Sequence, residues 1–176
     1  SVAIGINTSG KIVGYALDSD GLSRAAYWAS STSPAVDLGP LGDDFSNTFA
    51  GAINASGKII GAATTTDFSV WRAVVWSNSS SPAVDLGTPG GDFSNSETLG
   101  LNDRGQIVGD AWTDDGAVNH AVFWRNSSSP AIDLNSLIPA DSGWVLEIAI
   151  AINASGEIVG HGTIGGNSHA FALIPM

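Results

Sequence analysis

The chain has 176 residues, which is enough for one domain with a hydrophobic core of its own. Only six Lys and Arg residues stand against 17 Asp and Glu residues, and the net charge of -11 disfavours nucleic acid as a partner. The absence of cysteine excludes a disulfide framework and a cysteine-based zinc site, and no apolar run approaches the ~20 residues that span a bilayer.

The sequence repeats itself with a period of about 48 residues. Asp37, Asp85 and Asp133 recur at this spacing within the segments PAVDLG, PAVDLG and PAIDLN. A fixed period of this size is typical of repeat proteins, in which neighbouring units share a core. We therefore expect a single β-repeat domain over residues 1–176, with repeats at about 1–47, 48–95, 96–146 and 147–176.

Each repeat opens with a predicted strand that runs into an asparagine, and a glycine follows three residues later. An asparagine side chain can close a turn on its own main chain, and glycine tolerates a positive φ, so this spacing predicts a tight hairpin. The second strand follows at once as KIVG, KIIG, QIVG or EIVG. The predicted turn residues are Asn7 and Gly10, Asn54 and Gly57, Asn102 and Gly105, and Asn153 and Gly156.

A third and a fourth strand complete the predicted repeat. The third strand is a short apolar block, which reads RAAYW at 24–28, RAVVW at 72–76, HAVFW at 120–124 and HAFAL at 169–173. The fourth strand is the PAVDL segment, which the last repeat does not contain, so the last unit is expected to lack its fourth strand. An uncovered strand edge favours pairing with another chain.

Four-stranded units of about 40 to 50 residues without helices are typical of propeller blades. We therefore expect an all-β fold in which one chain forms a four-bladed β-propeller. The alternative is a larger propeller that another chain completes. A β-solenoid is less favoured than a propeller, because the repeats of β-solenoids are usually shorter than about 48 residues.

The three ordered motifs resemble the HAF repeat, which characterises a family of bacterial proteins regarded as extracellular. The name-giving triplet stands here as His169-Ala170-Phe171, and the family's Asp-Leu-Gly element is closest at residues 85–91, DLGTPGG. Two repeats carry arginine in place of the histidine. The resemblance covers essentially the whole chain. It implies export and a β-repeat fold without implying an activity, so we expect a secreted or cell-surface protein whose signal peptide lies outside this sequence.

Two polar positions of the repeat are candidates for a structural network. One is the aspartate of the fourth strand, and the other is the arginine or histidine that opens the third strand. A carboxylate that becomes buried needs a cation or hydrogen-bond donors, and a basic residue on the neighbouring strand would supply them. The predicted network consists of Asp37, Asp85, Asp133, Arg24, Arg72, His120 and His169.

The sequence predicts no catalytic or nucleotide site. The segment GINTSGKIVG lacks the Ser or Thr and the helix that must follow the lysine of a P-loop, and no G-x-S-x-G nucleophile motif is present. Asp18 and Asp20 resemble the start of a calcium loop, but the later ligands of such a loop are missing. We therefore expect no cofactor, with calcium as the one weak candidate.

Three tryptophans fall outside the repeat period and are the candidate ligand-binding residues: Trp71, Trp112 and Trp144. An aromatic ring near a loop can stack on a sugar, and it can equally fill the core where a blade deviates from the pattern. The sequence leaves both interpretations open.

Together these features favour a non-enzymatic module outside the cell. The expected role is structural or assembly-related, with self-association into a homo-oligomer or filament through the unpaired strand edge. The alternative is a carbohydrate-binding propeller whose partner is an extracellular glycan. A secreted hydrolase is the third choice.

Overall fold

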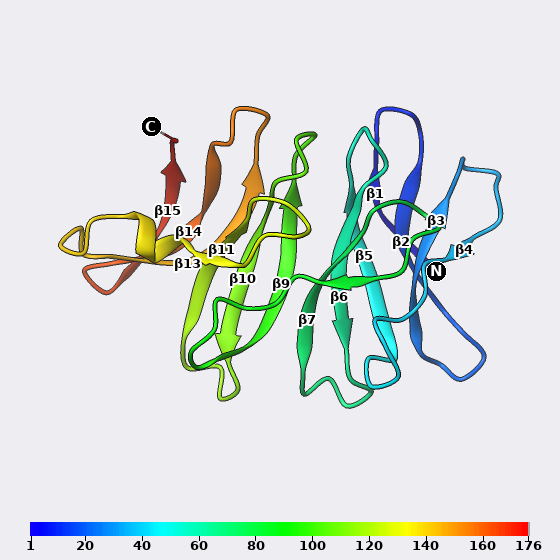
Figure 1. The fold of residues 1–176 in the computed structure, drawn as a ribbon, viewed down its shortest axis with the longest axis horizontal. Coiled ribbons are helices and arrows are strands. Elements are labelled where there is room, and N and C mark those ends of the chain that lie inside the picture. The colour runs from blue at the N-terminus through cyan, green and yellow to red at the C-terminus, as the bar shows by residue number, and fades with distance from the viewer. Residues whose placement is uncertain (176) are drawn as a thin grey trace. The chain divides into compact units, whose positions relative to one another are not determined.

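The computed structural model describes residues 1–175. Its strands form four antiparallel sheets, in which consecutive strands lie next to each other (Figure 1). The chain divides into two compact units, residues 1–85 and the residues from 86 onward, and each contains two sheets. The predicted all-β fold of repeated four-stranded units is confirmed.

The first unit contains two four-stranded sheets, here called the β1 sheet and the β5 sheet. The strands of the β1 sheet are β1 (Val2–Ile6), β2 (Ile12–Leu17), β3 (Ser23–Trp28) and β4 (Val36–Asp37). The strands of the β5 sheet are β5 (Asn47–Ile53), β6 (Ile59–Thr64), β7 (Trp71–Trp76) and β8 (Val84–Asp85).

The second unit contains the four-stranded β9 sheet and the three-stranded β13 sheet. The strands of the β9 sheet are β9 (Phe93–Leu101), β10 (Ile107–Thr113), β11 (Asn119–Trp124) and β12 (Ile132–Asp133). The strands of the β13 sheet are β13 (Trp144–Ile152), β14 (Ile158–Ile164) and β15 (Asn167–Leu173). A short 3₁₀ helix, η1 (Leu134–Leu137), directly follows β12.

The fourth strands are shorter than the five-residue segments that the sequence suggested. In β8 only Val84 and Asp85 pair with β7, opposite Val75 and Val74. Proline has no N–H to donate to a ladder, which prevents Pro82 from extending β8 at its start. Gly87 has a φ of 70°, and the chain turns away there. The fourth strand is therefore only two residues long and pairs with the edge of the third strand.

The hairpin that opens each repeat forms as its Asn-to-Gly spacing predicts. The side-chain Oδ1 of Asn7 accepts hydrogen bonds from the main-chain N–H groups of Ser9 and Lys11, both at 3.0 Å, and Gly10 has a φ of 74°. The Asn7 side chain also donates to the main-chain oxygen of Asn54 at 3.0 Å. The turn asparagine thus joins the hairpin of the β1 sheet to the hairpin of the β5 sheet.

A second glycine recurs in every repeat as the last residue of the KIIG-type motif, and close packing of two strands explains it. At Gly61 in β6, an added Cβ would overlap the main-chain oxygen of Phe49 in β5. The register between β5 and β6 shifts between Ala50 and Ala52, so the bulged β5 brings its main chain close to β6. This contact requires a residue without a side chain.

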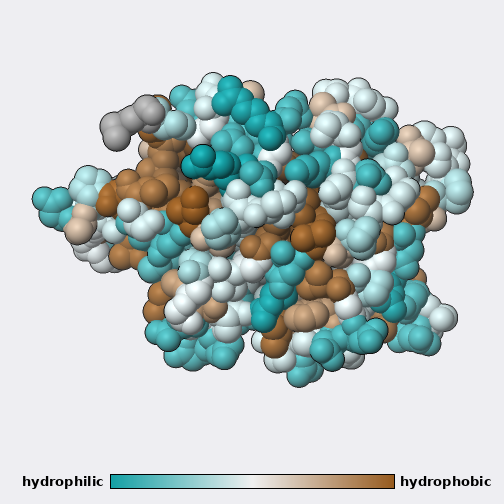
Figure 2. Space-filling view, viewed as in Figure 1, coloured by the Kyte–Doolittle hydropathy of each residue, from teal (hydrophilic) through white to brown (hydrophobic). Residues whose placement is uncertain are grey.

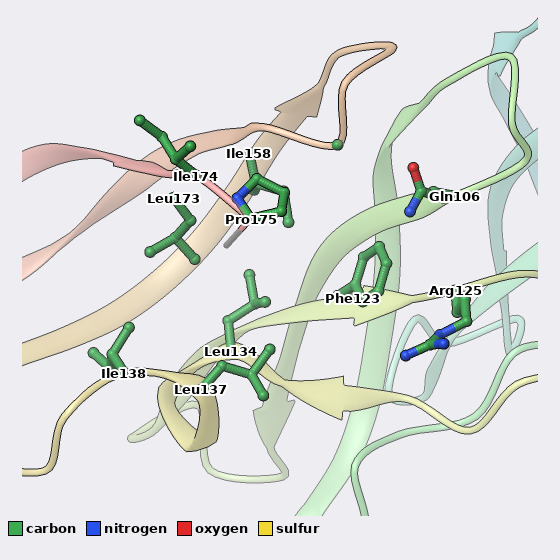
Figure 3. A pocket seen from close by; sticks show the side chains of 11 residues that line it. Gln106, Phe123, Arg125, Leu134, Leu137, Ile138, Ile158, Leu173, Ile174 and Pro175 are labelled. Carbon is green, nitrogen blue, oxygen red and sulfur yellow. The ribbon is translucent and has the colours of Figure 1, made fainter.

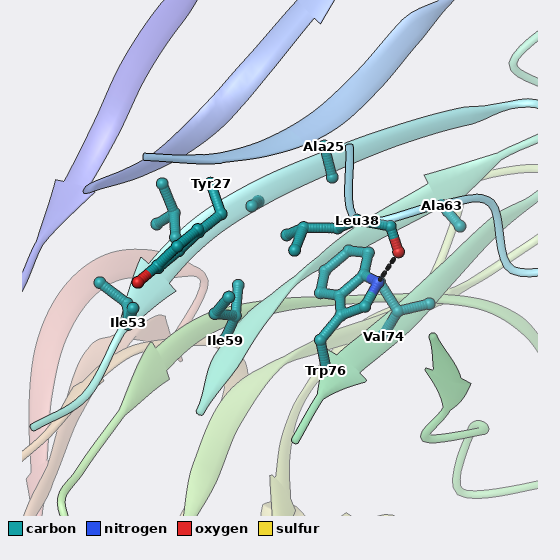
Figure 4. Close-up of a cluster of buried hydrophobic side chains, with 10 residues drawn as sticks. Ala25, Tyr27, Leu38, Ile53, Ile59, Ala63, Val74 and Trp76 are labelled. Carbon is teal, nitrogen blue, oxygen red and sulfur yellow. Dashed lines mark hydrogen bonds between the residues drawn. The ribbon is translucent and has the colours of Figure 1, made fainter. Parts of the chain in front are cut away.

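The core of the first unit lies between the inner faces of its two sheets (Figure 4). Trp76 from β7 is fully buried, and its indole Nε1 donates a 3.0 Å hydrogen bond to the main-chain oxygen of Leu38. Tyr27, Ile59 and Val74 belong to the same cluster. The indole fills the core, and its one polar atom is satisfied by the segment that follows β4.

The second unit repeats this arrangement between the β9 and β13 sheets. Its buried cluster includes Val108, Leu134, Ile158 and Phe171. Trp124 in β11 is also fully buried, but it is not part of this cluster, and within the unit its position corresponds to that of Trp28. Its Nε1 donates a 2.8 Å hydrogen bond to the main-chain oxygen of Leu86. Among the described residues, no helix has the length and apolar character needed to cross a bilayer.

Candidate docking site along strand β15

Within residues 1–175 no fourth strand pairs with the outer edge of β15, whereas the third strand of each other sheet has such a partner. The pairing registers place Phe171 of β15 where Ala26, Val74 and Val122 stand in β3, β7 and β11. Those three residues pair with Asp37, Asp85 and Asp133 of the fourth strands. The three covered sheets therefore show how a fourth strand pairs with a third strand in this fold, and β15 can be compared with them.

Side-chain contacts reinforce the fourth strand in two of the three covered sheets. Nδ1 of His120 lies 2.7 Å from Oδ2 of Asp133, and Nε of Arg72 lies 3.6 Å from Oδ2 of Asp85. Each pair joins the beginning of a third strand to the aspartate of a fourth strand. The sequence-derived network thus brings these four residues together across the edge of a sheet.

The β1 sheet uses its basic residue differently. Arg24 Nε lies 2.8 Å from Oδ2 of Asp18, in the loop between β2 and β3, and its Nη1 donates to the main-chain oxygen of Ser46 at 2.8 Å. Asp37 instead accepts a 2.8 Å hydrogen bond from the N–H of Gly39. Asp18 is nearer to Arg24 in sequence and takes the place that Asp37 would have filled.

His169 occupies the equivalent basic position on β15. Its side chain is exposed, and its ring lies edge-on to Trp144, with 6.3 Å between the ring centroids. No ion pair with an acidic residue is found for His169 within residues 1–175. The basic residue is thus present on β15, and within residues 1–175 no fourth-strand aspartate lies beside it.

A groove of about 370 Å³ runs along β15. One wall is residues 170–173 of β15, and the opposite wall comes from the segment after η1 and from the start of β13. Figure 2 shows apolar residues gathered around η1 and β15, at the left of the view. The residues of the opposite wall are Ile138, Pro139, Ser142, Trp144 and Leu146.

Residues 1–170 match the model of a family described as "Protein of unknown function (DUF3466)". The chain belongs to this family. No curated protein matches it. The match covers all four sheets of this DUF3466 chain except the last residues of β15.

The three off-period tryptophans of the DUF3466 chain lie on three different sheets. Trp71 begins β7, where its ring stacks on Phe49 and its Nε1 donates to the main-chain oxygen of Phe68 at 3.1 Å. Trp112 lies in β10 and is half-buried. Trp144 begins β13 and borders the β15 groove. Of the three, Trp144 is the one that borders the candidate docking site.

The acidic loop that resembled a calcium loop is occupied by protein groups. Oδ1 of Asp18 accepts hydrogen bonds from the N–H groups of Asp20 and Leu22, and Oδ2 binds Arg24. The hydrogen bond from Leu22, together with the contacts to Arg24, lowers the pKa of Asp18. Within residues 1–175 no cluster of three or more acidic or histidine side chains is arranged to hold a metal ion.

Sequence reasoning missed the buried carboxyl group of Asp110 in the DUF3466 chain. Asp110 in β10 is only 3% exposed, and burial, together with the nearby Glu97 carboxylate, raises its pKa to about 7. Its Oδ2 accepts a 2.9 Å hydrogen bond from the side chain of Asn119. The sequence does show that Asp110 breaks the repeat, because the position after the KIVG-type glycine holds Tyr15, Ala62 and His161 in the other repeats.

Proposed function

We propose that this chain is a non-enzymatic structural module that assembles with further repeats by accepting a fourth strand at β15. The observation that carries the proposal is the edge of β15, which no described strand covers, whereas the equivalent edge is covered in each of the three other sheets. An exposed strand edge is a template for strand addition, in which main-chain hydrogen bonds provide affinity and side-chain contacts provide specificity.

The incoming strand is an extended segment of the type Pro-Ala-Val/Ile-Asp-Leu, supplied by another repeat of the same kind. Pairing at Phe171 in the register of the other sheets sets its aspartate next to His169, as Asp133 is set next to His120. The N–H of its leucine would donate to the oxygen of Ala170, because Leu38 donates to the oxygen of Ala25 at 2.9 Å. The occupant is thus identified by three contacts seen elsewhere in the chain.

The β1 sheet also has residues whose exposure favours assembly with another repeat. Trp28 stands at the position of Trp76 and Trp124, but it is only half-buried, and no hydrogen bond of its indole is found within residues 1–175. Ile6, which pairs with Ile12 opposite Trp28, is 69% exposed. A neighbouring repeat that brings a leucine carbonyl and an apolar face would satisfy both.

In this proposal the sheets are blades of a β-propeller, and strand addition at β15 completes its last blade. The HAF-like motifs, His169-Ala170-Phe171 and the DLGTPGG segment, support an exported, extracellular setting. Exposed apolar residues on the sheets and a net charge of -11 for the chain are both consistent with a protein that assembles with other repeats without binding nucleic acid.

The direct test uses a fluorescently labelled synthetic peptide with the sequence SPAVDLG, which is residues 81–87 of this chain. Fluorescence anisotropy measures its binding to the unlabelled protein, and a peptide with alanine in place of the aspartate is the matched control. We expect saturable binding of SPAVDLG and weaker binding of the control. Equal anisotropy for both peptides, with no saturation, would show that β15 does not accept this strand.

Sedimentation velocity over a range of protein concentrations tests the assembly itself. We expect the average sedimentation coefficient to rise with concentration and to fall when excess SPAVDLG peptide competes for β15. A strictly monomeric protein at the highest concentration, unaffected by the peptide, would contradict a role in self-assembly.

A second candidate function, carbohydrate binding, is favoured by one surface feature of the first unit. Phe68 is half-exposed, at 50%, and its ring lies 6.3 Å from the ring of Trp71. A shallow polar depression is formed nearby by Asp43, Asp67, Arg72 and neighbouring loop residues. Exposed aromatic rings beside hydroxyl and carboxylate groups suit sugar rings. A glycan panel probed with the protein and its Trp71→Ala variant tests this, and absence of binding to every glycan would reject it.

A further inference from the structure

The second unit contains an apolar cavity that is lined by residues of both of its sheets. Its volume is about 420 Å³, within the range of small-molecule sites (Figure 3). Phe123, Leu134, Ile158 and Leu173 form its floor and walls, and Leu137 and Ile174 lie at its exposed side, where their side chains are 63% and 71% exposed. The cavity therefore opens to solvent beside η1.

The repeat explains why the cavity exists. The registers place Leu173 where Trp76 stands in the first unit, Ile158 where Ile59 stands, and Phe123 where Tyr27 stands. In the first unit the Trp76 indole fills the space between the two sheets and is fully buried (Figure 4). In the second unit a leucine replaces the indole, and the walls that would surround an indole remain.

The neighbouring aromatic side chain does not refill the space. Phe171 replaces Val74, but its ring lies over Gly160, where an added Cβ would overlap it, and it borders the β15 groove. The residues of η1 close the cavity only from one side. The residues that surround Trp76 in the first unit therefore have counterparts around this cavity, but no indole side chain fills it.

One cationic group lies at the rim of this cavity. Arg125 directly follows β11 and lines the cavity on the side of Phe123, as Figure 3 shows. Its side chain is exposed, and no ion pair of Arg125 is found within residues 1–175. Gln106 is the other polar side chain in the lining, and no acidic residue is among the lining residues.

We propose that this cavity binds a small planar aromatic molecule that carries a carboxylate. The aromatic ring takes the place that Trp76 occupies in the first unit, packed on Phe123, Leu134 and Leu173. The carboxylate reaches Arg125, whose planar guanidinium donates paired hydrogen bonds to such a group. The apolar walls provide most of the affinity, and Arg125 selects an anionic ligand over a neutral one.

Isothermal titration calorimetry of the purified chain with indole-3-acetate tests the proposal, with 3-methylindole as the analogue that lacks the carboxylate. We expect indole-3-acetate to bind with a one-to-one stoichiometry and 3-methylindole to bind about tenfold more weakly. Arg125→Ala should remove this difference by weakening only the carboxylate ligand, whereas Arg125→Lys should retain part of it.

Two substitutions that fill the cavity provide the decisive control. Leu173→Trp should restore the indole that the other repeats contain, abolish binding of both ligands and raise the midpoint of thermal unfolding. Leu137→Trp fills the cavity from its exposed side, where a larger side chain does not disturb the core, so it tests the site if Leu173→Trp does not fold. Unchanged ligand binding in the folded filled variant, or no binding of either ligand to the original chain, would overturn the proposal. Binding of the SPAVDLG peptide is measured separately and depends on His169, so the two proposals can fail independently.

Discussion

His120 and Asp133 join the third and fourth strands of the β9 sheet, with 2.7 Å between Nδ1 of the histidine and Oδ2 of the aspartate. Arg72 and Asp85 make the corresponding contact in the β5 sheet at 3.6 Å. On β15 the same position holds His169, which is exposed and has an acidic partner nowhere in residues 1–175. The β13 sheet therefore carries the basic residue of this contact, and no described residue supplies the aspartate.

The first prediction concerns the side chain at position 169. His169→Ala should weaken binding of the SPAVDLG peptide about three- to tenfold, because the peptide aspartate loses its basic partner. His169→Arg should bind at least as well as the original chain, because Arg72 plays this part in the β5 sheet. Fluorescence anisotropy at low and high salt measures both. Equal affinity of all three proteins would separate the docking site from His169.

The second prediction concerns the buried indoles. Trp76→Leu should lower the free energy of unfolding by about 3 kcal/mol, because it removes the hydrogen bond to Leu38 and leaves a cavity in the first unit. Trp28→Leu is the matched control, since Trp28 has the same place in its sheet but is only half-buried. Chemical denaturation should show a clearly smaller loss for Trp28→Leu. Similar losses for the two variants would contradict the assignment of Trp76 to the core.

The third prediction tests the close approach of β5 to β6. Gly61→Ala should destabilise the fold by about 3 kcal/mol or more, because the new methyl group would overlap the main-chain oxygen of Phe49. Gly51→Ala is the control on the neighbouring strand, where the nearest atom to an added Cβ is 3.9 Å away. Thermal unfolding should separate the two variants by several degrees. A stable Gly61→Ala protein would show that the strands can move apart at little cost.

The fourth prediction concerns the pH dependence of stability. Burial raises the pKa of Asp110 to about 7, above its value in the unfolded chain, so the folded state binds this proton more tightly. The stabilising effect of protonated Asp110 is complete below about pH 4 and is lost as the pH rises to about 7. A protonated carboxyl also brings a donor to a buried site in which Oδ1 of Asp110 and Oδ1 of Asn119 both lack hydrogen-bond partners.

Asp110→Asn tests this dependence because it places a neutral group of the same shape beside Asn119. The variant should be more stable than the original chain at pH 8 by about 2 to 4 kcal/mol, and its stability should change less between pH 4 and 7. Asp67→Asn is the control in an exposed loop, where hydrogen bonds from Thr65 and Ser69 lower the pKa to about 2. That control should keep the slope of the original chain between pH 4 and 7. If Asp110→Asn keeps it as well, Asp110 is not its source.

The parts of the fold that depend on neighbours in sequence were predictable. The Asn7-to-Gly10 turn forms from local hydrogen bonds and a positive φ, and both are written into the residue types. The three-stranded β13 sheet follows from the missing fourth copy of the PAVDL segment. The predicted all-β, four-stranded repeat therefore required only the period and the turn chemistry.

Contacts between distant residues were not predictable from one sequence. The bond from Trp76 to the oxygen of Leu38 joins residues 38 positions apart, and a main-chain oxygen leaves no signal in residue type. The pairing of Arg24 with Asp18 depends on the course of one variable loop. The cavity beside Leu173 is seen only in the structure, although the change from Trp to Leu that explains it is visible in the repeat itself.

Hydrogen–deuterium exchange of the β15 main chain tests the central claim most directly. Residues 169–173 should exchange quickly in the protein alone and become protected when the SPAVDLG peptide is added, while the already covered β7 and β11 should not change. Protection that appears elsewhere, or an unprotected β15 at saturating peptide, would contradict the account that this edge accepts a fourth strand.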